Sequence, residues 1–235
     1  MKNTDLDLIL PVRKPAGSST YDLIRAFKRA AGFQGKIGHG GTLDPFASGV
    51  VLLLLERATG RFEEIRTWEK VYQAGLRLGA VSSTGDPQGT ISAVETAGSF
   101  RGGRKKILPI LEKFTGRFEQ KIPAYSAAQS GGERLYRLAR AGQPVEKSKP
   151  VEIRRLEMVA WRWPLLTLRV TCLGGVYIRQ LAEDIGNEMG CGAYLYFLER
   201  ERVGQYTLKE CLEPEEFSRF DRFRPKYPPA PGTTR

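Results

Sequence analysis

Six consecutive aliphatic residues, Val50 to Leu55, constrain the fold of this chain more than any other stretch. A short aliphatic run bounded by turn residues predicts a strand that is buried on both faces. Directly before it, the Asp44-Pro45 pair lies in a turn with glycines at positions 38, 40, 41 and 49. Proline restricts the backbone of the preceding residue, and glycines let a ligand approach the main chain closely. The sequence therefore predicts an acidic side chain in a rigid loop mounted on a buried strand.

The residues alone leave the chemistry of Asp44 open. No second carboxylate lies close to it in the sequence for acid–base work, and no set of metal ligands accompanies it. A lone carboxylate in a turn can act as a nucleophile or as a general base. It can also be a structural cap, which is a common role of aspartate in turns.

The charge of the chain indicates an acidic partner. Its 235 residues hold 37 lysines and arginines against 26 aspartates and glutamates, a formal net charge of +11. Such an excess is typical of proteins that bind nucleic acid. Two predicted helices carry basic faces, and each face is either an RNA contact or a solvated surface. These faces are Arg25, Lys28 and Arg29 after a helix start near Thr20, and Arg134, Arg137 and Arg140 within Glu133 to Ala141.

The cysteines and the single histidine exclude the usual zinc sites. Cys172, Cys191 and Cys211 form no Cys-x-x-Cys pair, and His39 is the only histidine. The three thiols are expected to be reduced, as in cytosolic proteins. The N-terminus lacks the features of a signal peptide, and no apolar run approaches the roughly 18 residues needed to span a membrane. We therefore expect a soluble, cytoplasmic protein.

The order of the predicted elements indicates an α+β fold. Strands outnumber helices and come in runs, which favours a mostly antiparallel sheet. Ser19 and Asp22 have the spacing of a capping box for the helix that follows them. Near the C-terminus, strands are predicted at Tyr194 to Leu198 and at Val203 to Leu208, separated by the charged residues Glu199 to Arg202.

One arginine occupies an unusual place. Arg179 lies in the first turn of a helix that is predicted to begin near Tyr177. The helix dipole at this end favours anions over cations. The local conflict predicts a specific partner for Arg179.

Four motifs together resemble the TruB family of pseudouridine synthases. The first is the opening stretch, GHGGTLDPFASGVVLLLL, at residues 38–55. The others are KPAGSS at 14–19, KVY at 70–72 with a following turn that holds Asp86 and Gly89, and GGVYIRQLAEDIG at 174–186 followed by GCGAYLYFLER at 190–200. The motifs occur in the family's order over nearly the whole chain.

The resemblance implies a pseudouridine synthase fold, with a mostly antiparallel mixed sheet flanked by helices and a central active-site cleft. It implies isomerisation of uridine to pseudouridine at position 55 in the T-loop of tRNA, without cofactor or metal. The stacked target would have to be flipped out of the loop to reach the enzyme. The implied partner is the T-arm of tRNA, and the protein is expected to act as a monomer without a membrane or a protein partner.

The resemblance also implies roles for individual residues. Asp44 corresponds to the family's nucleophile, which attacks C1′ or the base so that the glycosidic bond breaks. Arg179 corresponds to the arginine that pairs with this aspartate, and a guanidinium suits a carboxylate in a site without water. Tyr72 corresponds to the tyrosine that stacks on the base and can take the proton from C5. Substrate contacts are implied at His39, Tyr177 and Leu198. Lys14 corresponds to a lysine that supports the site.

The chain departs from the family pattern in two places. Family members often carry a lysine after Ser-Ala-x in the RNA-gripping insertion, whereas Gln129 stands here. We expect a catalytic domain over residues 1–211 with this insertion at about 117–150, then a disordered proline-rich tail over 212–235. A C-terminal RNA-binding domain of PUA type is not expected. These departures leave open a synthase acting on another RNA and a non-catalytic protein that binds or folds tRNA.

Overall fold

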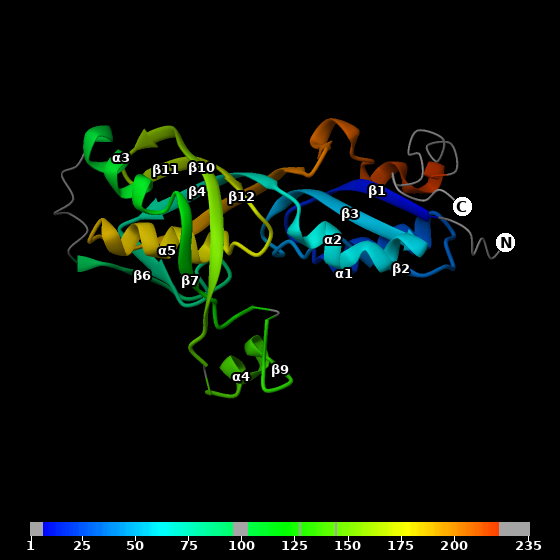
Figure 1. Ribbon diagram of the computed structural model, residues 1–235, viewed down its shortest axis with the longest axis horizontal. Coiled ribbons are helices and arrows are strands. Elements are labelled where there is room, and N and C mark those ends of the chain that lie inside the picture. The colour runs from blue at the N-terminus through cyan, green and yellow to red at the C-terminus, as the bar shows by residue number, and fades with distance from the viewer. Residues whose placement is uncertain (1–6, 96–102, 127, 144, 221–235) are drawn as a thin grey trace. The chain divides into compact units, whose positions relative to one another are not determined.

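A computed structural model describes residues 7–95, 103–126, 128–143 and 145–220 (Figure 1). The contacts divide the chain into two compact units. The first unit comprises residues 1–72 and 199–235, and the second comprises residues 73–198. Strands β4 (Lys70–Leu78) and β12 (Ala193–Val203) carry the chain from one unit into the other.

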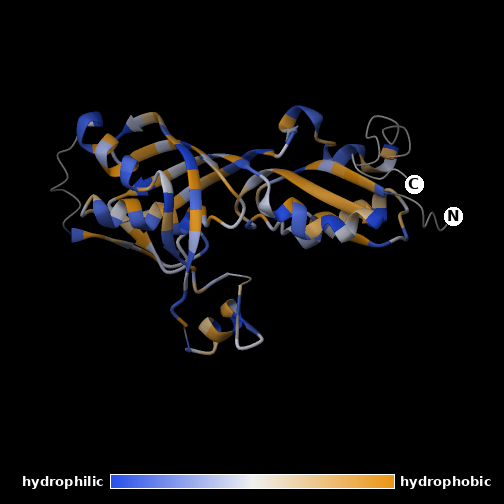
Figure 2. Cartoon of the chain, in the orientation of Figure 1, coloured by the Kyte–Doolittle hydropathy of each residue, from blue (hydrophilic) through white to orange (hydrophobic). Residues whose placement is uncertain are grey.

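The sheet of the first unit is built around β3 (Ser48–Glu56). Both β1 (Asp7–Lys14) and β2 (Ile37–His39) pair antiparallel with β3, and the end of β12 pairs parallel with it. Every residue from Val50 to Leu55 is at most 1% exposed, which confirms the predicted strand that is buried on both faces. Figure 2 shows the apolar residues that run along β1 and β3.

Helix α1 (Thr20–Ala30) begins where the sequence predicts it. The Ser19 hydroxyl accepts a hydrogen bond from the Asp22 N–H (3.1 Å), and the Asp22 carboxylate accepts one from the Ser19 N–H (3.0 Å). These two bonds confirm the predicted capping box. The remaining short elements of this unit are η1 (Arg57–Arg61), α2 (Phe62–Thr67), β13 (Tyr206–Thr207), η3 (Leu208–Glu210) and η4 (Pro214–Arg219).

The segment from Leu212 to Phe220 is folded, although the sequence places it in a disordered tail. Leu212 exchanges two backbone hydrogen bonds of 3.0 Å with β1, and η4 follows it. Phe217 and Phe220 pack edge-on against Phe27 of α1, with centroid distances of 5.3 and 5.1 Å. The expected boundary is wrong for residues 212–220, because the burial of two aromatic rings offsets the entropy cost of ordering the chain. Residues 221–235 lie outside the described residues.

The second unit has the strand order β12-β4-β11-β10-β7. Strand β10 (Ser148–Arg162) pairs antiparallel with β11 (Leu165–Cys172) and with β7 (Gly116–Lys121). Helix α3 (Arg104–Lys113) contacts β10, and α5 (Ile178–Glu188) contacts β7 and α3. The predicted α+β fold, with a mostly antiparallel sheet flanked by helices, is confirmed. Among the described residues, no helix is long and apolar enough to cross a membrane.

Smaller elements complete the second unit. Strands β5 (Ala80–Ser82) and β6 (Ile91–Ala93) form a hairpin. An insertion projects from the ends of β7 and β10 (Figure 1). It holds β8 (Gln129–Ser130), β9 (Glu133–Arg134) and helix α4 (Leu135–Arg140).

Strand β12 corrects the prediction of two strands near the C-terminus. It runs unbroken through the charged residues Glu199 to Arg202, which were expected to separate the two strands. Arg200 is only 2% exposed within it. A charged residue can occupy an inward strand position when its donors are bound by carbonyls. Hydropathy alone does not reveal such a position.

Candidate functional site

Asp44 lies in the loop between β2 and β3, and this loop is held on both sides of the aspartate. The Thr20 hydroxyl accepts a hydrogen bond from the Leu43 N–H (3.1 Å) and donates one to the Leu43 carbonyl (3.3 Å). On the other side, the Pro45 carbonyl accepts a hydrogen bond from the Gly17 N–H (2.8 Å). The half-buried Asp44 side chain is therefore mounted on a fixed main chain. Its chemical role stays a prediction.

Lys14, at the end of β1, is fully buried. Burial lowers the pKa of Lys14 to about 8, and the negative charge of Asp44 opposes this shift. Three carbonyl acceptors match the three protons of an ammonium, so Lys14 is charged at neutral pH. Its contacts join β1 to the Asp44 loop, and its predicted role in supporting the site stays a prediction. The ammonium donates to the carbonyls of Pro15 (2.9 Å), Ser18 (2.6 Å) and Pro45 (3.1 Å).

Arg200 on β12 is a residue of this site that the sequence reasoning missed. Its buried guanidinium donates to three carbonyls, those of Gly41 (3.2 Å), Thr42 (3.3 Å) and Val50 (2.7 Å). These acceptors precede and follow Asp44 in the chain, so Arg200 fastens both limbs of the loop. The sequence offered one signal for it: Arg200 follows Leu198 by two positions, and residues two apart lie on the same face of a strand.

Gly49 explains how Arg200 comes so close to β3. Its φ of +114° favours glycine, and a Cβ there would lie 2.3 Å from the Arg200 carbonyl oxygen. Any other residue would therefore push β12 away from the Asp44 loop.

His39 ends β2 beside the same loop. Its Nδ1 accepts a hydrogen bond from the Gly41 N–H (3.3 Å). Burial lowers the pKa of His39, and the positive charge of Arg200 lowers it further. The imidazole is therefore neutral at neutral pH and takes part in the turn. The expected contact with a flipped nucleotide stays a prediction.

Tyr72 on β4 and Leu198 on β12 are buried, at 7% and 4% exposure. Such burial is equally typical of ordinary core residues. The stacking role of Tyr72 and the wall role of Leu198 stay predictions.

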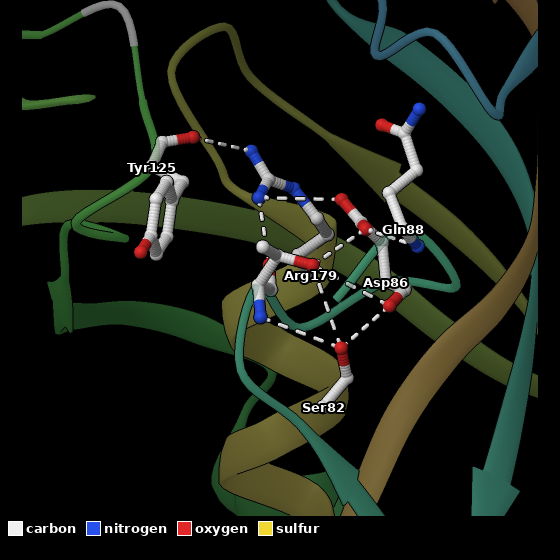
Figure 3. A network of polar contacts seen from close by, with 6 residues as sticks. Ser82, Asp86, Gln88, Tyr125 and Arg179 are labelled. Atoms are coloured by element: carbon white, nitrogen blue, oxygen red, sulfur yellow. Dashed lines mark hydrogen bonds and ion pairs between the residues drawn. The ribbon is translucent and has the colours of Figure 1, made fainter. Parts of the chain in front are cut away.

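Arg179 has the specific partners that its place in the helix predicts (Figure 3). It is 6% exposed in the first turn of α5. Nη1 donates to the Thr84 carbonyl (2.8 Å) and lies 3.5 Å from a carboxylate oxygen of Asp86, while Nη2 donates to the Tyr125 carbonyl (3.0 Å). The pairing of Arg179 with Asp44 stays a prediction, and Asp86 is a carboxylate partner that the sequence reasoning did not assign.

Asp86 is held in place by its own turn. It is 4% exposed, and its Oδ1 accepts hydrogen bonds from the Thr84 hydroxyl (2.7 Å) and the Gln88 N–H (3.0 Å). The Ser82 hydroxyl donates to the Asp86 carbonyl (2.5 Å). The turn thus aims a fixed carboxylate at the Arg179 guanidinium.

Substitution of Asp86 by asparagine is expected to destabilise the protein by about 3 kcal/mol, because it leaves the buried Arg179 charge without that carboxylate. Urea unfolding of the wild type and the variant measures the difference. Glu63→Gln is the control, since Glu63 is 72% exposed in its pair with Arg66 and its loss should cost less than about 0.5 kcal/mol. Equal unfolding midpoints for Asp86→Asn and the wild type would contradict the assigned ion pair.

Tyr177 precedes α5 and is held by a residue that the sequence reasoning missed. The fully buried Gln120 on β7 accepts a hydrogen bond from the Tyr177 N–H (2.9 Å) and donates one to its carbonyl (3.0 Å). The Lys149 ammonium lies 4.4 Å from the centre of the Tyr177 ring. Gln120 thereby fixes the start of α5, which carries Arg179 in its first turn. The substrate contact of Tyr177 stays a prediction.

The two predicted basic faces are present on their helices. Arg25 and Arg29 are exposed on α1, and Lys28 is half-buried. Arg25 is already engaged by Asp22 and lies 5.2 Å from the Tyr21 ring. The second face, in the insertion, is exposed and consists of Arg137 and Arg140 on α4 and of Arg134, which ends β9 directly before that helix. Contact of either face with RNA stays a prediction.

The cysteines carry no indication of a reactive site. Cys172 and Cys191 are buried, Cys211 is half-buried, and all three are thiols outside any disulfide. Burial raises the pKa of Cys211 to about 12, which leaves it protonated and unreactive. In the part of the chain that the structure describes, no cluster of three or more His, Cys, Asp or Glu side chains could hold a metal ion.

Comparison with known families and sequences identifies close relatives. The family model described as TruB family pseudouridylate synthase (N terminal domain) matches residues 28–178. The chain is 39% identical over 218 residues to tRNA pseudouridine synthase B of Parabacteroides distasonis, covering 90% of this chain and 92% of that protein. It is also 39% identical over 213 residues to the Burkholderia pseudomallei protein of the same name, covering 90% of this chain and 69% of that one.

Solved structures share the fold at lower identity. The chain superimposes on a chain of a Cbf5-Nop10-Gar1 complex with a TM-score of 0.69 and 24% identity, over 94% of this chain and 56% of the other. An H/ACA RNP bound to a substrate RNA containing 2′-deoxyuridine gives a TM-score of 0.67 and 22% identity, over 94% of this chain and 55% of the other. At this identity the similarity concerns the fold alone.

Proposed function

Because the chain belongs to the TruB family of pseudouridylate synthases, we propose that it isomerises uridine to pseudouridine at position 55 in the T-loop of tRNA. Relatives that share 39% of its sequence over nine-tenths of its length are named tRNA pseudouridine synthase B, and the chain is accordingly an enzyme of tRNA modification. Position 55 and the roles of individual residues rest on the family motifs. The observation that carries the proposal is the half-buried Asp44 in a loop fastened by Lys14 and Arg200.

The proposed reaction neither adds nor removes atoms. The Asp44 carboxylate attacks C1′ or the uracil ring, the bond from C1′ to N1 breaks, and the base turns. C1′ then bonds to C5, and the bond between Asp44 and the nucleotide breaks, which restores the free carboxylate. A proton leaves C5, for which Tyr72 is the proposed acceptor, and a proton joins N1. Such an isomerisation needs a positioned nucleophile and a base flipped out of its stack. Fixing the main chain on both sides of Asp44 gives the nucleophile one direction of attack.

Arg179 is proposed to act with Asp44 by stabilising its negative charge. Support comes from the environment of Arg179, where the Asp86 carboxylate and the carbonyls of Thr84 and Tyr125 together orient the guanidinium. A guanidinium fixed in this way loses little side-chain entropy when a further partner binds. The proposed nucleotide contacts are His39, Tyr177 and Leu198.

The partner proposed for the basic faces is the T-arm. The exposed arginines of α4 lie beside the ring of Tyr136, with guanidinium carbons 6.0 Å (Arg137) and 5.6 Å (Arg140) from its centre. Cations interleaved with an aromatic ring suit a phosphate backbone with unstacked bases. We still expect the enzyme to be monomeric and cytoplasmic and to need no protein partner.

The test is an assay on unmodified tRNA transcripts. We expect the protein to produce a single pseudouridine at position 55, detected by carbodiimide mapping, and none in a transcript with cytidine at that position. Modification at another uridine, or only in another RNA, would favour a synthase with a different substrate. Accelerated tRNA folding without any pseudouridine would instead favour a non-catalytic protein.

A further inference from the structure

The loop between β7 and the insertion connects Arg179 with α4. The Tyr125 carbonyl accepts a hydrogen bond from Arg179 Nη2 (3.0 Å). The carbonyl of the next residue, Ser126, accepts one from the Tyr136 N–H in α4 (3.2 Å). Two adjacent peptide units therefore join the guanidinium to the helix that carries the exposed arginines of the insertion.

Helix α4 is attached to this loop by its first turn. The first N–H groups of a helix have no acceptor within it, so they bind groups outside. Here the Leu135 N–H donates to the Ala128 carbonyl (2.8 Å), and the Tyr136 N–H donates to the Ser126 carbonyl. Leu135 is 1% exposed, so the helix is also packed through its first residue. A displacement of α4 must therefore displace the segment Tyr125–Ser126.

The contacts of Arg179 with Thr84, Asp86 and Tyr125 are of two kinds. Thr84 and Asp86 belong to one turn, whose own hydrogen bonds hold it together. Tyr125 belongs to the loop that continues into the insertion. The contact with Tyr125 therefore depends on the position of the insertion, whereas the contacts with Thr84 and Asp86 depend on a separate turn.

We propose that RNA bound by the exposed arginines of α4 sets the orientation of Arg179 through the main chain of Tyr125 and Ser126. This inference rests on the proposed function, in which Arg179 acts with the nucleophile. When the insertion is in place, the guanidinium has all three contacts. When the insertion moves, Arg179 loses the Tyr125 carbonyl, whereas its contacts with the turn of Asp86 are kept. Binding of the RNA by the insertion is thereby coupled to the reaction at the target uridine.

Removal of one N–H group tests the coupling. Tyr136→Pro deletes the donor to Ser126 in the first turn of α4, where proline is tolerated because no bond within the helix is lost. Tyr136→Ala is the matched control, since it removes the same ring and keeps the N–H. At saturating enzyme, we expect single-turnover product formation by Tyr136→Pro to be about tenfold slower than by Tyr136→Ala, with tRNA affinities within about threefold. Equal rates for the two variants would overturn the proposal.

A double-mutant cycle asks whether the effect passes through Arg179. If it does, Tyr136→Pro should cost no further activity in an Arg179→Lys background. An undiminished tenfold loss in that background would overturn the coupling while leaving the proposed function intact. A wild-type rate for Arg179→Lys alone would instead refute the role of Arg179 in the proposed function. If Tyr136→Pro does not fold, as circular dichroism would show, the exposed pair Arg137→Ala/Arg140→Ala replaces it, with the same loss expected at saturating enzyme and the same disappearance in the Arg179→Lys background.

Discussion

Replacement of Asp44 by asparagine is expected to lower pseudouridine formation by about 10⁴-fold or more, because an amide cannot replace a carboxylate nucleophile. The change keeps the shape of the side chain, and the bonds that hold the loop come from the main chain and from Thr20, Lys14 and Arg200. The variant should therefore fold like the wild type. Its tRNA affinity should stay within about threefold, since contacts to phosphates dominate such affinities.

Single-turnover assays on tRNA transcripts, with binding measured separately by filter retention, check this expectation. Asp184→Asn is the control, because Asp184 is also a half-buried aspartate but lies on α5, where it accepts a hydrogen bond from Gln180 (2.9 Å). The control should keep the wild-type rate. Product formation by Asp44→Asn at the wild-type rate would refute Asp44 as the nucleophile.

Replacement of Arg200 by methionine is expected to slow product formation about 100-fold, because it frees both limbs of the Asp44 loop and small misplacements of a nucleophile are costly. Three carbonyls would lose their donor, and that of Val50 is buried, so the variant should also be less stable by about 3 kcal/mol. Assays are therefore run well below its unfolding temperature. A positioning residue should change kcat and leave KM for tRNA nearly unchanged.

His39 reports on Arg200 independently of activity. As the only histidine, it supplies all the imidazole ring-proton signals in proton NMR, so their titration needs no assignment to a residue. Arg200→Met should raise the pKa of His39, because the positive charge that helps to lower it is removed. Arg200→Lys keeps the charge, but its three donors lie on one nitrogen and cannot replace the planar guanidinium, whose separate nitrogens reach the three carbonyls. It should leave the pKa of His39 near the wild-type value and still lower kcat, and a fully active Arg200→Lys would contradict a positioning role.

The distance in sequence between interacting residues explains which predictions were confirmed. The capping box of α1 lies within four residues, from Ser19 to Asp22. The burial of β3 is predicted by six consecutive aliphatic residues. Both signals are local, so they could be read before the structure was known. Residues 212–220 were misjudged because their order depends on Phe27, which lies in a distant helix.

By itself, the sequence determined the family, the α+β class, the buried strand and the placement of Asp44 in a glycine-rich loop directly before that strand. These properties follow from motifs and from the periodicity of apolar residues, which depend on near neighbours. Only the tertiary structure decided which groups hold the site. The bond from Arg200 to Val50 spans 150 residues of chain, and that from Arg179 to Tyr125 spans 54. A buried cation needs carbonyl or carboxylate partners, and the tertiary fold determines which ones lie close to it. Neighbouring residues in the sequence therefore do not predict these partners.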